Sequence, residues 1–478
     1  MAKTDIKKRL LNERSLSVIV HSLFSAWMLS FAFEGQIFYS LAEAYNFDPS
    51  VTVFSGIATL FAGLLFCGLF IKTKKAARRL FLTSNIIFIA VSVFFFFPPS
   101  VFWRPGIIVS SFLCGACVAG WAFCLKSSTP KNERIKMAAD MLILSNIFMI
   151  ILNMASIHIS PRTGLALAVM MLIAAFAFAL KISDNDTSVS SGASEQKDNP
   201  VSIVKPLLFL SLFIVTITIN SGLMYQVVNP AFAHLQDLAS WYWALPYIVA
   251  ILVIRNLPSK VNRSNILYVA IAMIGLSFVA FMGLGRGPAA YLVVDTLMMS
   301  ACGIYDLFWW TMLGEMLEYG SNPSKILGIG MSANVLGVLL GGVIGSVIRS
   351  SNMESASPTL LALAVVCVTL VMLPPLHKRL YSLLKDNAYL SAFYELPAQE
   401  QTMHIDRAAE FGKLSERESQ VAFLLLQGKT YKSIAEDLLI SENTVKYYVK
   451  NIYSKFGVQS RAELFSVVLK KEDISSIA

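Results

Sequence analysis

Twelve long apolar runs constrain this chain more than any other feature of its sequence. A helix that crosses about 30 Å of hydrocarbon needs about 20 mostly apolar residues, because its backbone groups must bond to one another. Charged residues make up only 14% of the chain, whereas soluble domains carry about 25%. The sequence therefore predicts a multi-pass membrane protein and argues against a wholly soluble enzyme. The runs occupy residues 15–38, 51–71, 80–97, 106–125, 138–159, 163–181, 205–228, 238–255, 266–285, 288–316, 326–348 and 358–376.

One polar segment divides the runs into two groups of six. It extends from Ser183 to Pro200 and consists mostly of small polar residues, which cannot bury enough apolar surface to fold alone. The expected domains are an N-terminal segment at 1–14, a first six-span half at 15–181, a cytoplasmic linker at 182–204, a second six-span half at 205–376, a juxtamembrane connector at 377–412 and a further domain at 413–478.

The basic residues of the short loops predict the orientation, since Lys and Arg are retained on the cytoplasmic side. Sixteen of them lie in one set of alternate loops, and only four, Arg104, Arg162, Arg286 and Arg349, lie in the other. With an even number of spans, both termini lie on the basic side. We therefore expect a protein of the bacterial cytoplasmic (inner) membrane, surrounded by membrane lipid, with its N- and C-termini in the cytoplasm. The net charge of +9 is then partly a signal of topology.

Two halves of six spans resemble the major facilitator superfamily over about residues 15–376, on hydropathy and loop pattern alone. This resemblance implies an all-α fold with a twelve-helix transmembrane bundle. The best local marker of that superfamily is a Gly-x-x-x-Asp-Arg-x-Gly-Arg-Arg loop between spans two and three. If Gly68 is placed first, Lys72 occupies the aspartate position and Lys75 the second glycine position. The gating pattern of transporters is therefore missing, which argues against active transport.

Ionisable residues inside spans are costly and are therefore functional candidates. Glu34 lies in the first span, His158 near the outer end of the fifth, and Asp295 and Asp306 in the tenth. Eleven residues separate the two aspartates, about three helical turns, so they face a similar direction and could line one cavity at two depths.

Aromatic residues accompany these carboxylates in the sequence. Carboxylates beside aromatic faces suit a cationic or aromatic-amine ligand. In the alternative interpretation the aromatic residues form an interfacial belt and the carboxylates only hydrogen-bond a neighbour. The candidates for binding an unknown small molecule are Glu34, Asp295, Tyr305, Asp306 and Trp309.

The sequence offers no chemistry typical of an enzyme. Neither part of the chain shows a nucleophile–base pair, a cluster of metal ligands or a phosphate-binding loop, so we expect no catalysis, no cofactor and no metal site. All six cysteines fall inside apolar runs. Cys114 and Cys117 have the spacing of a redox pair, but no base or metal ligand adjoins them, and we interpret them as small helix residues.

The C-terminal domain carries a complete set of helix signals. Ser415-x-x-Glu418 is a capping box that opens a helix, and Gly428 closes it. A second helix is expected from about Tyr431 to Leu438. Ser441 caps a third helix, which runs to about Phe456 with Gly457 as its stop, and Ser460-x-x-Glu463 opens a fourth.

The second and third of these helices form a helix-turn-helix, whose second helix can enter the major groove of double-stranded DNA. Lys446, Tyr447 and Lys450 project from one face near the start of that helix. Lys455 and Arg461 extend a basic stripe that contains no acidic residue between Asn443 and Ala462. Such a stripe suits phosphates, so we expect DNA as a partner.

This segment resembles the LuxR/FixJ/NarL-type helix-turn-helix over its full length. The matching elements include Leu414-Ser-Glu-Arg-Glu418, Ile434-Ala435, Thr444-Val445, Lys455-Phe456-Gly457-Val458 and Arg461-Ala-Glu463. The resemblance implies a four-helix domain. The residues that it implies are Lys446, Tyr447 and Lys450 for base contacts, Thr430, Ser441, Thr444 and Arg461 for phosphate contacts, and Leu464, Val467 and Val468 for homodimer formation through the final helix. Tyr448 replaces the usual histidine, from which we expect altered packing.

These features predict a one-component, membrane-embedded transcriptional regulator. The tail leaves no room for a phosphorylated receiver domain, so the twelve-span domain must provide the input, by binding a small molecule that shifts its conformation. The alternative hypothesis is a secondary transporter, or a transporter that also signals, with a DNA-binding appendage.

Overall fold

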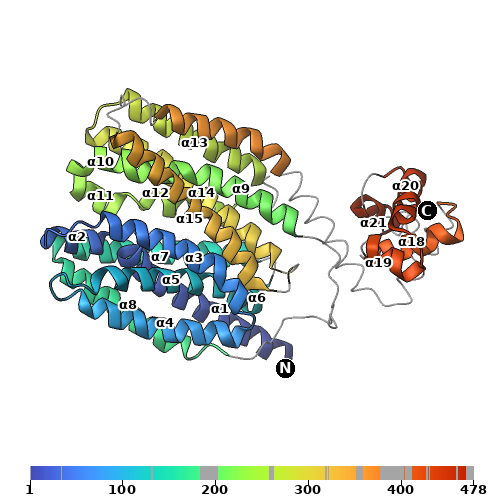
Figure 1. Cartoon of the computed structure of the whole chain (residues 1–478), viewed down its shortest axis with the longest axis horizontal. Helices are drawn as coiled ribbons and strands as arrows, with labels where there is room; N and C mark the ends of the chain where they lie inside the picture. The colour runs from blue at the N-terminus through green and yellow to red at the C-terminus, as the bar shows by residue number, and fades with distance from the viewer. Residues whose placement is uncertain are drawn as a thin grey trace. The chain divides into compact units, whose positions relative to one another are not determined.

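The computed structural model describes residues 2–33, 35–130, 133–183, 203–257, 263–317, 320, 322–350, 359–376, 403, 412–426, 429, 431–458 and 461–469. The chain divides into two compact units. The membrane unit contains the apolar helices and the tail unit contains the C-terminal helices, and each is described by itself. Every regular element in the described ranges is helical, as the all-α prediction requires (Figure 1).

Twelve helices of the described residues are long and apolar enough to cross a bilayer, one for each predicted run. Most of the predicted linker and of the predicted connector lies outside the described residues. The spans are Glu13–Ala44, Ser50–Phe70, Lys74–Phe94, Trp103–Ser128, Arg134–His158 and Pro161–Ala179, then Val204–Ala231, Ala233–Arg255, Ile266–Gly283, Pro288–Met316, Pro323–Ile348 and Thr359–Leu376.

Several spans are built from more than one helical segment. The first half contains α1 (Ala2–Trp27), η1 (Met28–Ala32), α2 (Gln36–Ala44), α3 (Ser50–Phe70), α4 (Lys74–Phe94), α5 (Trp103–Gly120), α6 (Ala122–Ser128), α7 (Arg134–His158) and α8 (Pro161–Ala179). The second half contains α9 (Val204–Leu223), η3 (Met224–Val228), α10 (Asn229–Ala231), η4 (Ala233–Leu235), α11 (Gln236–Tyr242), α12 (Leu245–Arg255), α13 (Arg263–Gly283), α14 (Pro288–Met316) and α15 (Pro323–Ser350), followed by the helix Thr359–Leu376.

Small residues let the spans approach closely. A Cβ added to Gly63 of α3 would lie 1.9 Å from the carbonyl oxygen of Phe112, and one added to Gly115 of α5 would lie 2.3 Å from that of Leu60. In the second half, a Cβ on Gly222 of α9 would lie 2.3 Å from the carbonyl oxygen of Val338 on α15. Each half therefore has a pair of helices whose backbones nearly touch, as is typical of helix packing in membranes.

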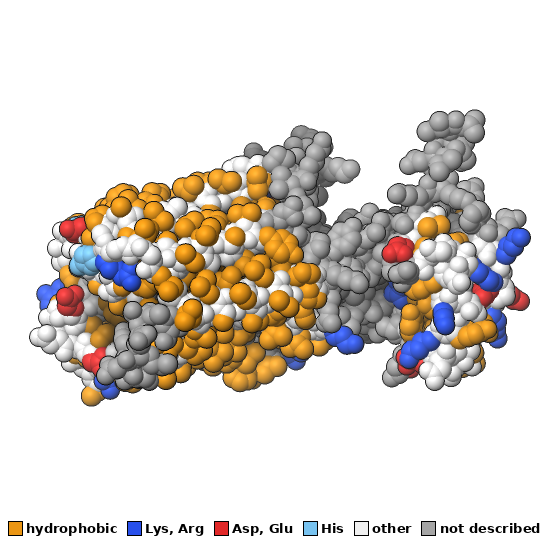
Figure 2. Space-filling view, turned by 90° about the horizontal axis from the view of Figure 1, so that it is seen from above, with side chains coloured by type: hydrophobic (Ala, Val, Ile, Leu, Met, Phe, Trp, Pro, Cys, Tyr) orange, Lys and Arg blue, Asp and Glu red, His pale blue; other side chains and the backbone are white. Residues whose placement is uncertain are grey.

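The flank of the membrane unit is apolar. Figure 2 shows hydrophobic side chains over the visible flank, and large ones such as Leu208 and Val371 are exposed. A soluble monomer rarely exposes a continuous apolar surface of this extent. This surface is suited to lipid.

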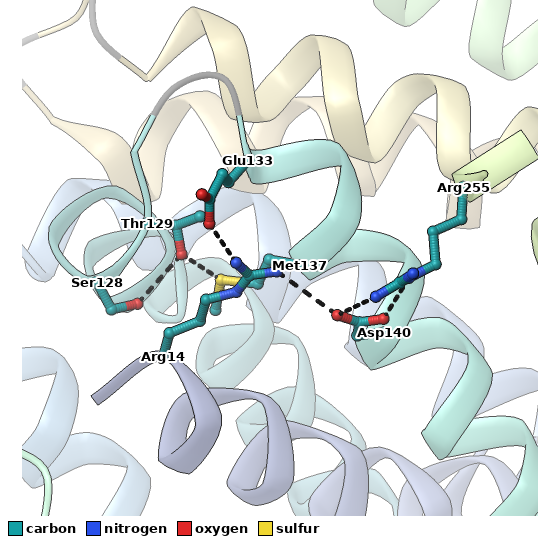
Figure 3. A network of polar contacts seen from close by, with 7 residues as sticks. All are labelled: Arg14, Ser128, Thr129, Glu133, Met137, Asp140 and Arg255. Atoms are coloured by element: carbon teal, nitrogen blue, oxygen red, sulfur yellow. Dashed lines mark hydrogen bonds and ion pairs between the residues drawn. The ribbon is translucent and has the colours of Figure 1, made fainter. Parts of the chain in front are cut away.

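A polar network joins the two halves at the end where the predicted cytoplasmic loops lie (Figure 3). Arg255, from the second half, donates through Nε to Asp140 Oδ1 at 2.6 Å and through Nη2 to Oδ2 at 3.3 Å. Arg14 pairs with Glu133 and approaches Asp140 at 3.5 Å. Beside this network, Arg134 donates to the carbonyl oxygen of Gly314 on α14 at 2.7 Å.

The tail unit is a small helical domain with its own core. Its helices are α18 (Glu416–Leu426), α19 (Tyr431–Leu438), α20 (Glu442–Phe456) and α21 (Arg461–Leu469), which agree with the predicted positions. The buried core residues are Val421, Ala422, Leu425, Leu426, Ile434, Ala435, Val445, Val449, Ile452 and Leu464.

Candidate functional site

Local capping fixes the position of α20, the second helix of the helix-turn-helix. Ser441 Oγ accepts a hydrogen bond from the backbone N–H of Thr444 at 3.1 Å, and the two hydroxyl groups lie 2.8 Å apart. Gly457 ends the helix in the left-handed region, with φ of 64°. Both predicted signals are confirmed. The buried stripe of Val445, Val449 and Ile452 turns one face of α20 into the core and leaves the other exposed.

The exposed face of α20 carries the predicted base-contacting residues. Tyr447 is 62% exposed, which is unusual for a large aromatic side chain without a partner surface. Lys446 and Lys450 are also exposed, and Lys446 forms an ion pair of 3.1 Å with Glu442 one turn earlier. Tyr448, at the position that departs from the resembled pattern, packs against the core instead.

Lys455, which the sequence analysis places in the basic stripe, is exposed and has an acidic partner. Its Nζ donates to Glu418 Oε2 at 2.6 Å and to the carbonyl oxygen of Lys413 at 3.0 Å. These contacts link α20 to α18 and to the residues just before it. Arg461 Nη2 donates to the carbonyl oxygen of Lys429 at 2.7 Å. Thr430 lies outside the described residues.

Glu418 has two roles in the structure. Its carboxylate accepts from the backbone N–H of Ser415 at 2.8 Å, while its own N–H donates to Ser415 Oγ at 3.3 Å, which confirms the capping box. The residue is only 6% exposed. This burial favours a higher pKa, but the hydrogen bonds from Lys455 and Ser415 outweigh it and hold the pKa of Glu418 below its usual range.

The candidate dimer residues lie on α21. Leu464 is 1% exposed and belongs to the core of the domain, and Val468 packs against that core. Val467 is half-buried. Leu464 therefore has a structural role inside the domain.

The candidate ligand residues line two adjoining cavities in the membrane unit. The larger has a volume of about 840 Å³ and Asp295 lies in its wall. The smaller has a volume of about 230 Å³ and is lined by Tyr305, Asp306 and Trp309, among others. Glu34 lies outside the described residues. Sequence reasoning anticipated one cavity with carboxylates at two depths; the structure places one aspartate in each of two cavities.

The polar groups of the cavities differ in their partners. Tyr247 donates through its hydroxyl to Asp306 Oδ2 at 2.7 Å. In contrast, Asp295 Oδ2, the Tyr305 hydroxyl and Trp309 Nε1 are buried with no hydrogen-bond partner. Buried polar atoms are nearly always satisfied in native proteins. Unsatisfied polar atoms in the wall of a cavity are therefore suited to a ligand.

Two π-helical turns form part of the cavity walls. η1 lies in the first span of the first half and η3 in the first span of the second half. Leu29 of η1 and Met224 of η3 line both cavities. Such turns are rare and are frequent at functional sites. No pattern in the sequence predicts these turns.

Other residues that the sequence analysis singled out lie where a structural role explains them. His158 Nε2 lies 3.2 Å from Ser240 Oγ, so it links α7 to α11. Cys114 and Cys117 are buried free thiols. Among the described residues, no group of three His, Cys, Asp or Glu side chains could hold a metal ion.

The geometry defines the class of this protein: a twelve-span bundle joined in one chain to a helix-turn-helix domain. Residues 412–468 match the family described as bacterial regulatory proteins, luxR family. The chain belongs to the luxR family through this domain, and a luxR-type domain implies binding to DNA.

Relatives in the luxR family match the tail domain alone. The spore germination protein GerE of Bacillus subtilis (strain 168) is 39% identical over 61 residues, 13% of this chain and 82% of GerE. The transcriptional regulatory protein LiaR of the same strain is 38% identical over 58 residues, 12% of this chain and 28% of LiaR. A protein of Aeromonas salmonicida is 49% identical over 57 residues, 12% of this chain and 29% of that protein.

The membrane unit has the fold of the major facilitator superfamily. It is similar to the human organic anion transporter MFSD10 (TETRAN), with a TM-score of 0.59 and 11% identity over 77% of this chain and 99% of that one. It is similar to the proton:xylose symporter XylE, with a TM-score of 0.59 and 13% identity over 78% of this chain and 96% of that one. It is also similar to the Escherichia coli fucose:proton symporter FucP, with a TM-score of 0.52 and 13% identity over 75% of this chain and 98% of that one. These likenesses establish the fold and the multi-pass character.

Proposed function

We propose that this chain is a one-component transcriptional regulator of the bacterial inner membrane. One observation carries the proposal: a single polypeptide joins a complete luxR-type domain to a twelve-span bundle whose cavities contain unsatisfied polar groups. A small molecule binds in the bundle, and the bound state alters promoter binding by the tail. The coupling between the two sites is bounded by the differential affinity of the ligand for the two states, typically about 1–3 kcal/mol.

Topology and assembly follow from the same proposal. Both termini lie in the cytoplasm in this proposal, where the tail meets DNA, and the excess of Lys and Arg in one set of loops supports this orientation. The tail acts as a homodimer, because two copies of a recognition helix read two half-sites. The chain uses no cofactor and catalyses no reaction; its output is occupancy of a promoter.

In this proposal α20 reads the DNA sequence. Lys446, Tyr447 and Lys450 face base edges, and this assignment is supported by their exposure on one face of α20. The phosphate contacts are assigned to Thr430, Ser441, Thr444 and Arg461 by the resemblance to the luxR family.

The test measures promoter binding by the full chain in lipid nanodiscs. Lys446→Ala and Lys450→Ala should each lower affinity for the specific promoter by about fivefold to 150-fold, because a good base contact contributes about 1–3 kcal/mol of discrimination. Arg417→Ala, which removes an exposed positive charge from α18, is the matched control and should bind normally. Affinity should also fall steeply as salt rises. Normal specific binding by both lysine variants would remove α20 from the reading role.

Secondary transport is the rival function. The cavities and the fold shared with proteins that are named as transporters favour it, whereas Lys72 and Lys75 depart from the loop pattern of transporters. Uptake of a ligand into proteoliposomes would support transport. Ligand-dependent promoter occupancy without uptake would support the regulator.

A further inference from the structure

The two cavities of the membrane unit are continuous in their lining. Eight residues belong to the walls of both: Leu29, Phe33, Met149, Met224, Met299 and Val338, together with the aromatic residues Tyr225 and Trp243. The boundary between the larger and the smaller cavity is thus mainly apolar, with aliphatic and thioether side chains beside three aromatic rings. A hydrocarbon segment can lie there without leaving polar groups unsatisfied.

The helix α14 places one carboxylate on each side of this boundary. Asp295 lines only the larger cavity and Asp306 only the smaller. The two residues share a face of α14, and their separation along the helix is about 16 Å at a rise of about 1.5 Å per residue. Among the described lining residues, these two aspartates are the only acidic ones, and neither Lys nor Arg is present.

Each carboxylate has surroundings that suit a cation. Asp295 Oδ2 is buried without a hydrogen-bond partner. Asp306 accepts from Tyr247 and lines the same cavity as Tyr305 and Trp309, whose rings are stacked with centroids 6.2 Å apart and an interplanar angle of 13°. Aromatic faces beside a carboxylate favour an ammonium group. An ionised carboxylate that is largely shielded from water is costly unless a counter-charge accompanies it.

We propose that the two cavities form one binding site for an elongated dication, with an ammonium group at each end and an aliphatic spacer between them. This inference rests on the proposed function, since it names the ligand class of the same sensor. One ammonium pairs with Asp295 and the other with Asp306, while the spacer crosses the shared apolar boundary. A monoamine leaves one buried carboxylate without a counter-charge and binds less tightly.

The experiment uses the full chain in lipid nanodiscs and a series of linear diamines: diaminobutane, diaminooctane and diaminododecane. Dodecylamine is the matched monoamine. Thermal unfolding reports binding, because a ligand that binds only the folded state raises the melting temperature. We expect affinity to rise with chain length and diaminododecane to bind at least tenfold more tightly than dodecylamine.

Two variants test whether each aspartate binds one ammonium end of the diamine. Asp295→Asn and Asp306→Asn should each reduce the affinity for diaminododecane to that for dodecylamine, and retained dodecylamine binding shows that the variants are folded. Asp237→Asn, on the exposed surface of α11, is the control and should leave both affinities unchanged. Equal binding of the monoamine and the diamine, or no binding of either, overturns the proposal.

Promoter occupancy separates the two hypotheses. Diamine binding without any effect on promoter occupancy overturns the regulator function but supports the dicationic ligand. Promoter occupancy that responds to another compound, with no diamine binding, overturns the ligand class and supports the regulator.

Discussion

At the scale of single residues, Glu418 illustrates how one side chain stabilises two levels of structure. It completes the capping box of α18 and also pairs with Lys455 at the end of α20. The spacing Ser415-x-x-Glu418 predicts the first role, because that interaction is local. The second depends on a contact between residues 37 positions apart. Sequence reasoning therefore assigned Lys455 to the DNA-facing stripe and could not identify its acidic partner.

Glu418→Gln should destabilise the tail domain by about 1–2 kcal/mol, because it removes the negative partner of Lys455 from a buried position. Chemical unfolding of a fragment that begins at Lys413 measures this loss. Such a fragment has its own core. Glu416→Gln removes an exposed charge from the same turn and should change stability little. Additive effects in a double-mutant cycle with Lys455→Gln would contradict the ion pair.

The same substitution should change the response of the domain to acid. The pKa of Glu418 is lowered in the folded state, so its stabilising contribution is complete above the unfolded value of about 4.3 and is lost as the pH falls through the folded value. The wild-type fragment should approach the stability of Glu418→Gln at low pH. A difference that persists unchanged below that range would contradict this assignment.

At the scale of elements, the sequence predicts most of the structure because the signals are local. Each apolar run became a span, and Ser441 and Gly457 set the two ends of α20. The π-helical turns η1 and η3 were not predicted, since they depend on how spans pack around the cavities. The division of Asp295 and Asp306 between two cavities was likewise not predictable, because helical period gives direction but not the side chains of facing helices.

Gly457 offers a test at this scale. Its φ of 64° is in the left-handed region, and a Cβ built there meets nothing within 4 Å. Gly457→Ala should therefore lower the stability of the tail domain by about 1 kcal/mol through backbone strain alone. Gly457→Asn should cost less, because asparagine tolerates this conformation. Equal stability of all three proteins in thermal unfolding would show that the end of α20 is not held in this conformation.

At the scale of the whole molecule, the membrane unit consists of two halves that pack against each other through several spans. α7 of the first half packs against α12 and α14, and α15 packs against α3 and α5. The Arg255–Asp140 pair adds a polar link between α12 and α7. This pair was not predicted from the sequence, because Arg255 counted only as a topology signal and nothing in the spacing relates it to Asp140.

Breaking this link should alter the resting activity of a regulator whose halves move relative to each other. Arg255→Gln and Asp140→Asn should shift basal promoter occupancy in the same direction, by about twofold to tenfold, and the double variant should resemble the single ones. A reporter gene in cells measures the effect. Arg79→Gln, which removes an exposed charge from α4, is the matched control. Additive shifts, or shifts of opposite sign, would mean that the pair does not act as one link.

The self-contained core of the tail has an evolutionary consequence. Every side chain in that core comes from residues 421–464, and GerE is little more than this domain, since the match covers 82% of it. Recombination can therefore join such a DNA-binding domain to a different membrane domain without changing the core of either. A chimera in which GerE replaces the native tail domain should respond to the original stimulus and regulate a different operon.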